Sequence, residues 1–345
     1  MSKPTAVIIS DVHYSMQTLE VADKAMRLAV AKSNELGVPL VVCGDLHDSK
    51  ANIRAECMNT MTKTFELCKQ HSIILRGNHC SVNEKSEEHA LGFLSRTSQI
   101  VSTIGKFRNW CFIAYQHDPM EFSLALARIP KGSTIFCHQG VMGSNAGHYI
   151  QDKSAVPIEW IKGYRVISGH YHNRQTLHSY GSIPPGMSVN GPRGLWDYVG
   201  NPYTLNFAEA NDPEKGFQIL YEDGSLEFVP TNLRKHIIIN IEYTNSAVFT
   251  ISKYAPIKEK DIIWVKVTGP SDEVCNLTHK SIAKVFNFTH DFKLDLIPLE
   301  VTPGEKLEVN ESITQVQMLD TLIDNLTNTD NTRKLRLKEL WKRLN

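Results

Sequence analysis

The stretch Thr5-Ala-Val-Ile-Ile-Ser-Asp-Val-His13 joins a short apolar run to an Asp-x-His pair. The apolar part, Thr5–Ser10, ends in polar residues and is typical of a buried strand. A helical pattern follows over Met16–Leu36 and stops at Gly37, which is a signal for a helix end. Strands that alternate with helices of this length indicate βαβ units and a parallel sheet. The sequence therefore predicts an α/β fold whose first strand leads directly into the Asp-x-His pair.

Four later strand candidates are also followed by polar side chains of the same kinds. The strands are predicted at Val38–Cys43, Ser72–Leu75, Thr134–Cys137 and Tyr164–Ser168. The residues that follow them are Gly44-Asp45-Leu46-His47-Asp48, Gly77-Asn78-His79, His138 and Gly169-His170-Tyr171-His172. In open α/β sheets, ligands bind outside the carboxyl ends of the strands. These four segments are therefore expected to meet Asp11 and His13 at one edge of the sheet.

The residue types in these segments suit a pair of divalent metal ions. Imidazole, carboxylate and amide oxygen together favour Mn, Fe or Zn over an ion that prefers oxygen alone. An aspartate between two histidine-rich sets can bridge two ions, and ions roughly 3.5–4 Å apart can clamp a phosphate. A lone Asp-x-His or Gly-Asn-His is more often incidental than functional. Five such elements in one order, each at a strand end, argue against chance and predict a dinuclear metal site.

Composition places the chain among folded proteins without a nucleic-acid or membrane bias. Apolar residues make up 41% and charged residues 21% of the 345 residues, which argues against wholesale disorder. The formal net charge is zero, which is mild evidence against a protein that coats DNA. No run approaches the roughly 20 apolar residues that cross a bilayer, so no membrane partner is expected. The seven cysteines are odd in number and scattered, which indicates a reducing compartment and a cytoplasmic protein.

Changes in pattern along the chain predict three parts. Residues 1–234 hold the βαβ pattern and all five motifs, and they end in short strands with a hairpin turn at Glu222-Asp223-Gly224. Residues 235–302 combine strand-like runs with one helix over Ser271–Val285, which predicts a small α+β domain. Residues 303–345 are polar with helical spacing, and the last helix places on one face Leu337, Leu340, Trp341 and Leu344. That face is apolar enough to dock in a groove of a partner.

Taken in this order, the motifs resemble the five signature motifs of the calcineurin-like metallophosphoesterases. The resemblance implies a sandwich of two β-sheets flanked by helices, which extends the simpler βαβ pattern. It also implies two sets of metal ligands that share one aspartate. One set is Asp11, His13, Asp45 and His172, and the other is Asp45, Asn78, His138 and His170.

The same resemblance implies a catalytic pair outside the two ligand sets. His79 would face the phosphate as a general acid or a charge stabiliser, and Asp48 would sit behind His79 and orient its ring. The family usually has Asp or Glu after Gly-Asn-His, whereas this chain has Cys80. The hydrogen bonds of that carboxylate are lost, which puts the rate in doubt more than metal binding. Weaker candidates for contact with the substrate, each of which could equally be structural, are His47, Lys50, His148, Tyr171 and Arg174.

Two features narrow the branch of this family. Protein Ser/Thr phosphatases continue Gly-Asp-x-x-Asp with Arg-Gly, whereas here Asp48 is followed by Ser49-Lys50. This chain resembles a segment of SbcD-type DNA repair nucleases over Asp197–Tyr203, Phe207–Ala210 and Lys215-Gly216-Phe217. Asn201 stands in place of the usual Ser of that segment. The match covers nearly the whole chain up to about residue 302. The compact length also suits the phage recombination-endonuclease relatives, in which case the compartment is the host cytoplasm.

The SbcD-type resemblance implies a Mn²⁺-dependent DNA nuclease with 3′→5′ exonuclease and endonuclease activity, with Mg²⁺, Fe²⁺ or Zn²⁺ as alternatives to Mn²⁺. It also implies a homodimer and an ABC-type coiled-coil ATPase partner of the SbcC kind, which the C-terminal helices would grip. The alternatives for these helices are packing on their own domain and, as a remote third, lying on a membrane surface. The main alternative for the activity is a small-molecule phosphodiesterase or nucleotide phosphatase, which the zero net charge favours mildly. A scaffold without activity is the least favoured.

Overall fold

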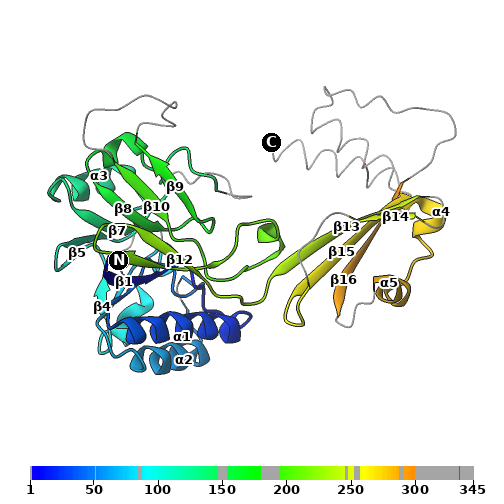
Figure 1. Ribbon diagram of the computed structural model, residues 1–345, viewed down its shortest axis with the longest axis horizontal. Helices are drawn as coiled ribbons and strands as arrows, with labels where there is room; N and C mark the ends of the chain where they lie inside the picture. Colours follow the sequence, from blue (N-terminus) through cyan, green and yellow to red (C-terminus); the bar gives the residue numbers. More distant parts are fainter. Residues whose placement is uncertain are drawn as a thin grey trace. The chain divides into compact units, whose positions relative to one another are not determined.

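The computed structural model describes residues 2–50, 52–83, 88–146, 154–179, 194–244, 248–251, 257–286, 291–299 and 334. The chain divides into two compact units, Met1–Pro298 and Leu299–Asn345, and nearly all the described residues lie in the first. Figure 1 shows the helices and strands of the first unit. The bounds 1–234, 235–302 and 303–345 stay predictions, and His148 and the apolar face of the last helix lie outside the described residues.

The first sheet has six strands in the order β12-β11-β1-β2-β3-β4. Its parallel strands β1, β2, β3 and β4 span Pro4–Ile9, Leu40–Val42, Ser72–Leu75 and Gln99–Val101. Strands β11 (Gly216–Tyr221) and β12 (Leu226–Pro230) extend the β1 side of the sheet in antiparallel pairing. The predicted hairpin at 222–224 is confirmed as the connection between these two strands. The parallel strands joined by helices confirm the predicted βαβ pattern.

The second sheet has six strands in the order β5-β6-β7-β8-β10-β9. Their bounds, in chain order from β5 to β10, are Ile104–Phe107, Trp110–Ile113, Thr134–His138, Arg165–Gly169, Gln175–His178 and Leu195–Tyr198. The four central strands are parallel, and the strands at both edges are antiparallel to their neighbours. The chain therefore enters this sheet at the edge strand β5 and leaves it from the interior strand β10, while the parallel centre directs the ends of β7 and β8 to the same side.

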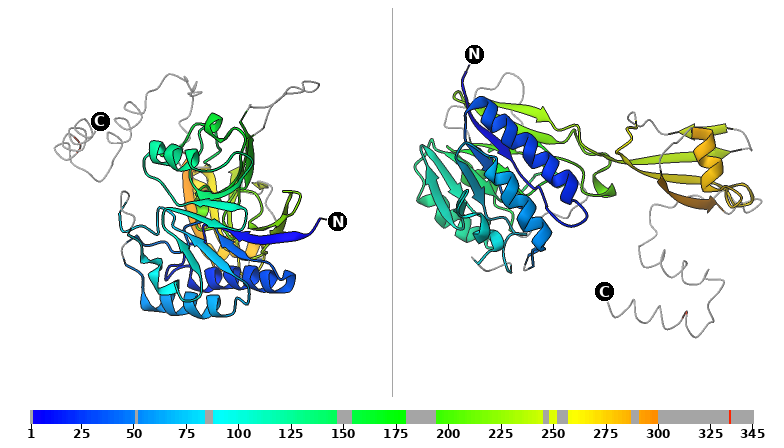
Figure 2. Two further views of the ribbon diagram at one scale, coloured as in Figure 1. Left: turned by 90° about the vertical axis from the view of Figure 1, so that its left-hand side faces the viewer. Right: turned by 90° about the horizontal axis from the view of Figure 1, so that it is seen from below.

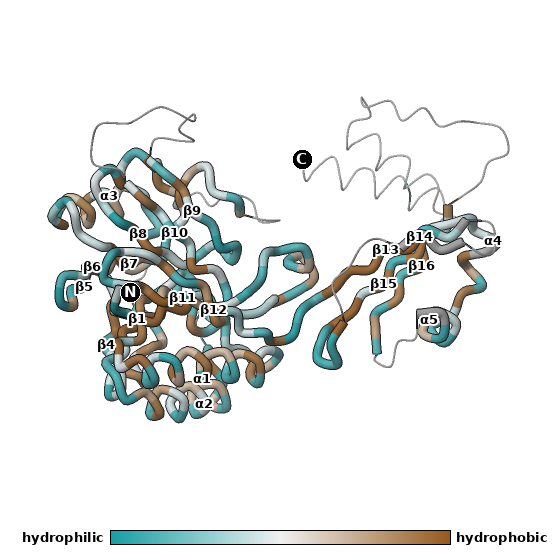
Figure 3. The backbone as a smooth tube through the Cα atoms, in the orientation of Figure 1, coloured by the Kyte–Doolittle hydropathy of each residue, from teal (hydrophilic) through white to brown (hydrophobic). Residues whose placement is uncertain are grey.

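The two sheets pack face to face, which confirms the predicted sandwich. Ala6 and Ile8 of β1 lie in a core that they share with Phe136 of the second sheet. Their neighbours Val7 and Ile9 lie in a different core, together with residues of the first two helices. Because both faces of β1 are buried, its sequence is a continuous apolar run and not an alternating one. Figure 3 shows such hydrophobic stretches along the central strands.

Helices cover the outer faces of the sandwich (Figure 2). Helices α1 (Leu19–Leu36) and α2 (Ala55–Glu66) pack on the first sheet, and α3 (Pro119–Ala127) packs on the second. Short 3₁₀ helices, η1, η2 and η3, span Ala90–Leu94, Ile158–Ile161 and Phe207–Glu209. Within the described part of the chain, no helix combines the length and the apolar character that crossing a bilayer requires.

The first helix begins later than its sequence pattern predicts. It starts at Leu19 because Ser15 to Thr18 form a turn, in which the Thr18 hydroxyl donates to the carbonyl of His13 at 2.6 Å. This turn brings the start of α1 to the end of β1. The predicted end at Gly37 is confirmed, since Gly37 has φ +67° and its N–H donates to the carbonyl of Ser33.

A smaller sheet has four strands in the order β14-β13-β15-β16. In chain order, from β13 to β16, they span His236–Thr244, Val248–Ile251, Ile262–Pro270 and Phe292–Leu299. Alternate residues of β15 are buried, so that one face of this sheet forms an apolar core. The helix predicted over 271–285 is instead two helices, α4 (Ser271–Val274) and α5 (His279–Phe286). The break falls at 275–278, and Thr278, at its end, exchanges hydrogen bonds with Ser281 in the first turn of the second helix.

Candidate metal centre

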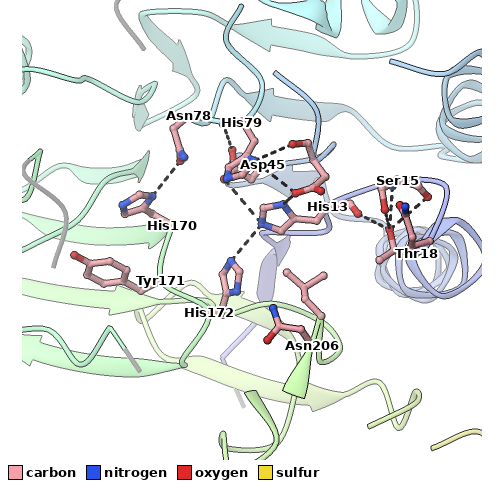
Figure 4. Close-up of a pocket in the computed structure, with 13 residues that line it drawn as sticks. His13, Ser15, Thr18, Asp45, Asn78, His79, His170, Tyr171, His172 and Asn206 are labelled. Atoms are coloured by element: carbon pink, nitrogen blue, oxygen red, sulfur yellow. Dashed lines mark hydrogen bonds and ion pairs between the residues drawn. The ribbon is translucent and has the colours of Figure 1, made fainter. Parts of the chain in front are cut away.

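The residues that follow the central strands of both sheets gather around one pocket of about 690 Å³ (Figure 4). From the first sheet, His13 follows β1, Asp45 follows β2, and Asn78 and His79 follow β3. From the second sheet, His170 and His172 follow β8. Asp11 and His138 lie fully buried beneath these side chains. The structure thus brings all seven proposed metal ligands and His79 into one region.

Three overlapping groups of side chains have the spacing of metal ligands, and two of them consist of proposed metal ligands alone. Asp11, His13 and His172 offer ligand atoms that all lie within 4.8 Å of one another. Asp11, Asp45 and His138 form a second group with the same spacing, and His138 Nε2 is 3.2 Å from Asp45 Oδ2. The same Asp45 oxygen is 4.0 Å from His13 Nε2. Asp45 therefore approaches members of both groups, as a bridging carboxylate would, and Asp11 belongs to both groups.

Asn78 extends the second group toward the mouth of the pocket. Its side-chain oxygen is 3.0 Å from His138 Nε2 and 3.1 Å from His170 Nδ1. Figure 4 shows Asn78 and His170 facing one another across this edge of the site. An amide oxygen and two imidazole nitrogens that converge in this way provide donors for a divalent transition metal.

Left-handed backbone conformations occur at four of these residues. The φ angles are +51° at Asp11, +50° at His13, +46° at Asp45 and +91° at His170. Such conformations cost about 1–3 kcal/mol each in residues other than glycine, and they persist only where surrounding contacts enforce them. Here two of the enforcing contacts join the strand ends, from His13 N to the carbonyl of Asp45 at 3.0 Å and from Asp11 N to that of Gly44 at 3.2 Å. Their clustering at one site indicates a functional constraint.

Main-chain N–H groups fix the two central carboxylates. The N–H of His79 donates to Asp45 Oδ1 at 2.9 Å, which leaves Oδ2 directed at His138. The N–H of His170 donates to both oxygens of Asp11 at 3.2 Å. Because rigid backbone holds both carboxylates, their positions do not depend on flexible side chains.

The electrostatics of the second group favour a positive charge between the carboxylates. Burial alone would lower the pKa of His138, but the charges of Asp45 and Asp11 raise it to about 9. Burial alone would raise the pKa of Asp45, but the neighbouring histidines, His138 foremost, hold it well below its usual range. A site that draws positive charge onto an imidazole in this way fits a divalent cation.

The orientation of two imidazole rings also fits a cation. His13 Nδ1 is 3.0 Å from Asp48 Oδ1, and His172 Nδ1 is 2.6 Å from Glu209 Oε1. A carboxylate at Nδ1 favours a proton on that nitrogen and leaves a lone pair on Nε2. The two Nε2 atoms are directed at one another, 3.2 Å apart (Figure 4). The Nε2 atom of His172 is also 4.0 Å from Asp11 Oδ1. Lone pairs and a carboxylate that face one point fit a metal ion there.

His79 lines the pocket outside these two groups, but it belongs to the third, together with His13 and Asp48. Its Nδ1 donates to the main-chain carbonyl of Asp48 at 2.9 Å. The carboxylate of Asp48 is farther, at 3.5 Å, and is closer to His13, at 3.0 Å. Asp48 therefore stands next to His79 as expected, but it holds the ring through its backbone, while its carboxylate contacts His13.

Cys80 does not face the pocket. Its side chain is fully buried in the hydrophobic core that also contains Cys57 and Met61. Burial raises the pKa of the Cys80 thiol to about 12, so the group is neutral. A carboxylate at this position would be buried among apolar side chains, which accounts for the thiol in physical terms.

The weaker candidates for substrate contact fare differently. Tyr171 lines the pocket. His47, Lys50 and Arg174 do not line it, and their contact with the substrate stays a prediction. His47 is fully buried beside a smaller pocket of about 250 Å³, and the guanidinium of Arg174 lies over the ring of Phe228, 4.1 Å from its centroid. Sequence adjacency to a ligand motif therefore did not predict which way these side chains point.

Glu209 is a residue of the site that sequence reasoning did not single out. It is buried at the end of η3 and hydrogen-bonded to His172. Burial alone would raise its pKa, but the hydrogen bond from His172 lowers it to about 2. The only sequence signal was its place ahead of Lys215-Gly216-Phe217 in the segment similar to SbcD-type nucleases. Other lining residues that were missed, none of them in a ligand motif, are Ser15, Gln17, Thr18, Leu205 and Asn206.

Comparisons with known proteins add similarities of structure only. No protein-family model matches the sequence, and no curated protein does. Among solved structures, nuclease MPE from Pseudomonas putida is similar over 65% of this chain and 87% of its own, with 13% identity and a TM-score of 0.31. GAP50, the anchor in the inner membrane complex of Plasmodium, is similar over 67% of this chain and 86% of its own, with 10% identity and a TM-score of 0.37.

At scores this low, neither likeness assigns a function. The chain's own residues define an α/β protein with a sandwich of two sheets and a candidate divalent-metal centre at the carboxyl ends of the sandwich's parallel strands.

Proposed function

We propose that the chain is a metal-dependent phosphodiesterase that acts on DNA, as the nuclease subunit of an SbcCD-like complex. The observation that carries the hydrolase part is the pair of ligand groups that meet at Asp11 and Asp45, with His79 beside them in an open pocket. Hydrolysis of a phosphodiester needs charge stabilisation on both sides of phosphorus and a proton for the leaving oxygen. The two groups and His79 are suited to these two tasks.

Each of two ions would have its own set of ligands. One would be held by Asp11, His13, Asp45 and His172, and the other by Asp45, Asn78, His138 and His170. When bound, such a pair supplies Lewis-acid stabilisation of the attacking and leaving oxygens. Mn²⁺ is proposed because the sets combine imidazole with carboxylate and amide oxygen, a mixture that Mg²⁺ accepts less readily than Mn²⁺, Fe²⁺ or Zn²⁺.

His79 is proposed to assist departure of the leaving oxygen. Its Nδ1 is engaged with the carbonyl of Asp48, which fixes the ring plane. Nε2 is then the nitrogen that can hold or give a proton to a group in the pocket. Tyr171 lines the same pocket and is proposed to contact the substrate.

The DNA substrate, the ATPase partner and the homodimer rest on the resemblance of residues 197–217 to SbcD-type nucleases. One observation favours the alternative of a small-molecule phosphodiesterase. None of the described residues that line the 690 Å³ pocket is Lys or Arg, so the pocket itself lacks the cations that usually contact a DNA backbone. The substrate is therefore the first thing to test.

The decisive experiment offers the purified chain two substrates in the presence of Mn²⁺: a linear duplex DNA and bis-p-nitrophenyl phosphate. We expect hydrolysis of both, its abolition by a chelator, and its recovery on adding Mn²⁺. DNA cleavage is expected to fall with salt, since contacts to phosphates release counterions. Hydrolysis of the small diester with no action on DNA at low salt, with blunt ends and overhangs both tested, would replace the nuclease proposal with the small-molecule alternative.

His79→Ala is expected to lower kcat for both substrates by about 10²–10⁴-fold, the usual contribution of a positioned general acid. Its Mn²⁺ affinity is expected to stay at the wild-type value, because His79 is in neither proposed ligand set. His178→Ala is a matched control, since His178 is an exposed histidine on β9 away from the pocket. Wild-type kcat in His79→Ala would exclude the role proposed for this ring.

Removal of residues 303–345 is expected to abolish binding of an SbcC-like ATPase and to leave hydrolysis of bis-p-nitrophenyl phosphate unchanged. The apolar side chains Leu337, Leu340, Trp341 and Leu344 are proposed to make this contact. The measurement is co-elution of the two proteins in size-exclusion chromatography, with Leu340→Glu in the full chain as a less drastic variant. Unchanged co-elution in both would favour the alternative that this segment packs on its own chain.

A further inference from the structure

Glu209 stands directly behind one of the proposed metal ligands. It is 2% exposed, and its Oε1 is 2.6 Å from His172 Nδ1. Its other oxygen, Oε2, accepts hydrogen bonds from the Asn201 side-chain amide and from the N–H of Leu205, both at 2.9 Å. Both carboxylate oxygens are thus engaged, which restrains the side chain. The ring of His172 is held at Nδ1 by a group that is itself restrained.

A second contact fixes the backbone of the same histidine. The Lys215 ammonium donates to the carbonyl of His172 at 3.1 Å and to Asp212 Oδ2 at 2.7 Å. It is also 3.7 Å from Glu209 Oε2, which partly balances the buried negative charge. Lys215 is itself buried, so these contacts are made away from bulk water. His172 is therefore held both at its main chain and at its ring.

The segment that carries Glu209 is anchored independently of the pocket. Thr204 Oγ1 is 2.9 Å from His236 Nδ1, at the start of β13. The Phe207 ring lies edge-on to the rings of His236 and Trp264, with centroids 4.9 and 5.2 Å away. A segment anchored on its far side can serve as a rigid support for a ligand.

We propose that Glu209 is a positioning residue of the metal centre, which holds the His172 ring so that its Nε2 faces Asp11 and His13. This inference rests on the proposed function, because it concerns the same metal site. Carboxylates that accept the second ring proton of a metal-bound histidine typically contribute about 10–100-fold to metal affinity. The competing explanation is that Glu209 and Lys215 are only a buried ion pair that stabilises the fold.

Asn201 has a specific part in this arrangement. It stands where the SbcD-type nucleases usually have Ser, and its side-chain amide donates to Glu209 Oε2. A serine hydroxyl is on a shorter side chain and would leave this oxygen with fewer donors. The departure from the family pattern therefore falls on a residue that orients Glu209, not on a metal ligand.

The test is a calorimetric titration of the full metal-free chain with Mn²⁺, for wild type, Glu209→Gln and Glu209→Ala. We expect two bound ions in the wild type. In the variants, the affinity for one ion is expected to fall by about 10–100-fold while the affinity for the other is kept. Gln retains an acceptor for His172 but loses the charge. The fall in Mn²⁺ affinity is therefore expected to be smaller in Glu209→Gln than in Glu209→Ala. Asn201→Ser is the mildest variant, with an expected loss of several-fold for the same ion.

The matched control is Asp197→Asn. Asp197 is also a buried carboxylate with two side-chain partners, Arg165 and Thr176, but it does not line the pocket or belong to a ligand group. Its Mn²⁺ affinities are expected to equal those of the wild type, even if its melting temperature falls. Melting of the metal-free proteins separates a loss of fold from a loss of metal, since only a purely structural role would lower stability without changing metal affinity.

Wild-type affinity for both ions in Glu209→Gln and Glu209→Ala would overturn the positioning role, and DNA hydrolysis by the same samples would then leave the proposed function standing. Weaker binding of one Mn²⁺ ion by these variants would support the positioning role. If the wild type at the same time hydrolysed neither substrate, the proposed function would be overturned. A wild type that binds no divalent ion would overturn both.

Discussion

Asp45→Asn is expected to abolish phosphodiester hydrolysis, with a fall in kcat of about 10³-fold or more. Asp45 Oδ2 lies 3.2 Å from His138 Nε2 and 4.0 Å from His13 Nε2, so this one carboxylate serves both ligand groups. Its loss removes a ligand from each proposed ion and a negative charge from between them. Lewis-acid stabilisation by such ions is worth several kcal/mol, and each 1.4 kcal/mol is about a factor of ten in rate.

Asparagine is a better replacement than alanine for this test. Residue 45 has φ +46°, a conformation that Asn tolerates and Ala does not favour. The Asn oxygen can also still accept from the N–H of His79, as Asp45 Oδ1 does. The fold should therefore survive, and the measurement is kcat for bis-p-nitrophenyl phosphate together with the number of Mn²⁺ ions bound.

The control for Asp45→Asn is Asp261→Asn, at a buried carboxylate in the four-stranded sheet region that accepts from the N–H groups of Lys235 and Lys258. It tests whether losing a buried charge is harmful in itself. Wild-type hydrolysis and two bound Mn²⁺ ions in Asp45→Asn would rule out a bridging role for this residue.

The parts of the fold that could be predicted from the sequence are those with local signals. The first strand and its helix were predicted because Thr5–Ser10 is apolar throughout and Gly37 ends the helix in a left-handed conformation. The order of strands in the second sheet could not be read locally, since β10 lies between β8 and β9 through pairings that no local pattern specifies. The sandwich itself was reached only through the resemblance.

In the candidate site, too, the residues with a local sequence signal were predicted and those without one were not. Its residues that belong to short motifs at strand ends were named from the sequence, because a strand end fixes where its next residues lie. Glu209 was missed because its contact with His172 joins residues 37 apart, through a segment with no ligand-like spacing. Arg174 is close to His172 in sequence, but its side chain stacks on Phe228, and its contact with the substrate stays a prediction. Side-chain direction at a turn depends on packing that the sequence pattern does not encode.

Gly169→Ala is expected to destabilise the protein and to disturb the metal centre at the same time. Gly169 ends β8 in the second sheet, and a Cβ there would lie 2.2 Å from the carbonyl oxygen of Cys43, which follows β2 in the first sheet. It would also lie 1.9 Å from Ser10 Oγ and 2.8 Å from His138 Nδ1. The obstacle is backbone of the opposite sheet, so the two sheets would have to separate locally. Overpacking of this kind costs about 1–3 kcal/mol, and sometimes more.

The metal centre is affected because Cys43 holds one of its proposed ligands. The carbonyl of Cys43 accepts from His138 Nδ1 at 2.7 Å and from Ser10 Oγ at 2.9 Å. A shift of this carbonyl moves the His138 ring away from Asp45. We therefore expect a fall of about 1–3 kcal/mol in the free energy of unfolding by urea, with an unchanged m-value, and weaker binding of one Mn²⁺ ion.

Gly92→Ala is the matched control for Gly169→Ala. A Cβ at Gly92 would meet nothing within 4 Å, so the free energy of unfolding is expected to stay within about 0.5 kcal/mol of the wild type. If Gly169→Ala behaved like Gly92→Ala in both measurements, the two sheets would have to be farther apart at Cys43 than the structure places them. The shared edge that brings Asp45 to His138 would then be looser as well. Close contact of the two sheets at this glycine is therefore a condition for the metal centre and not only for the core.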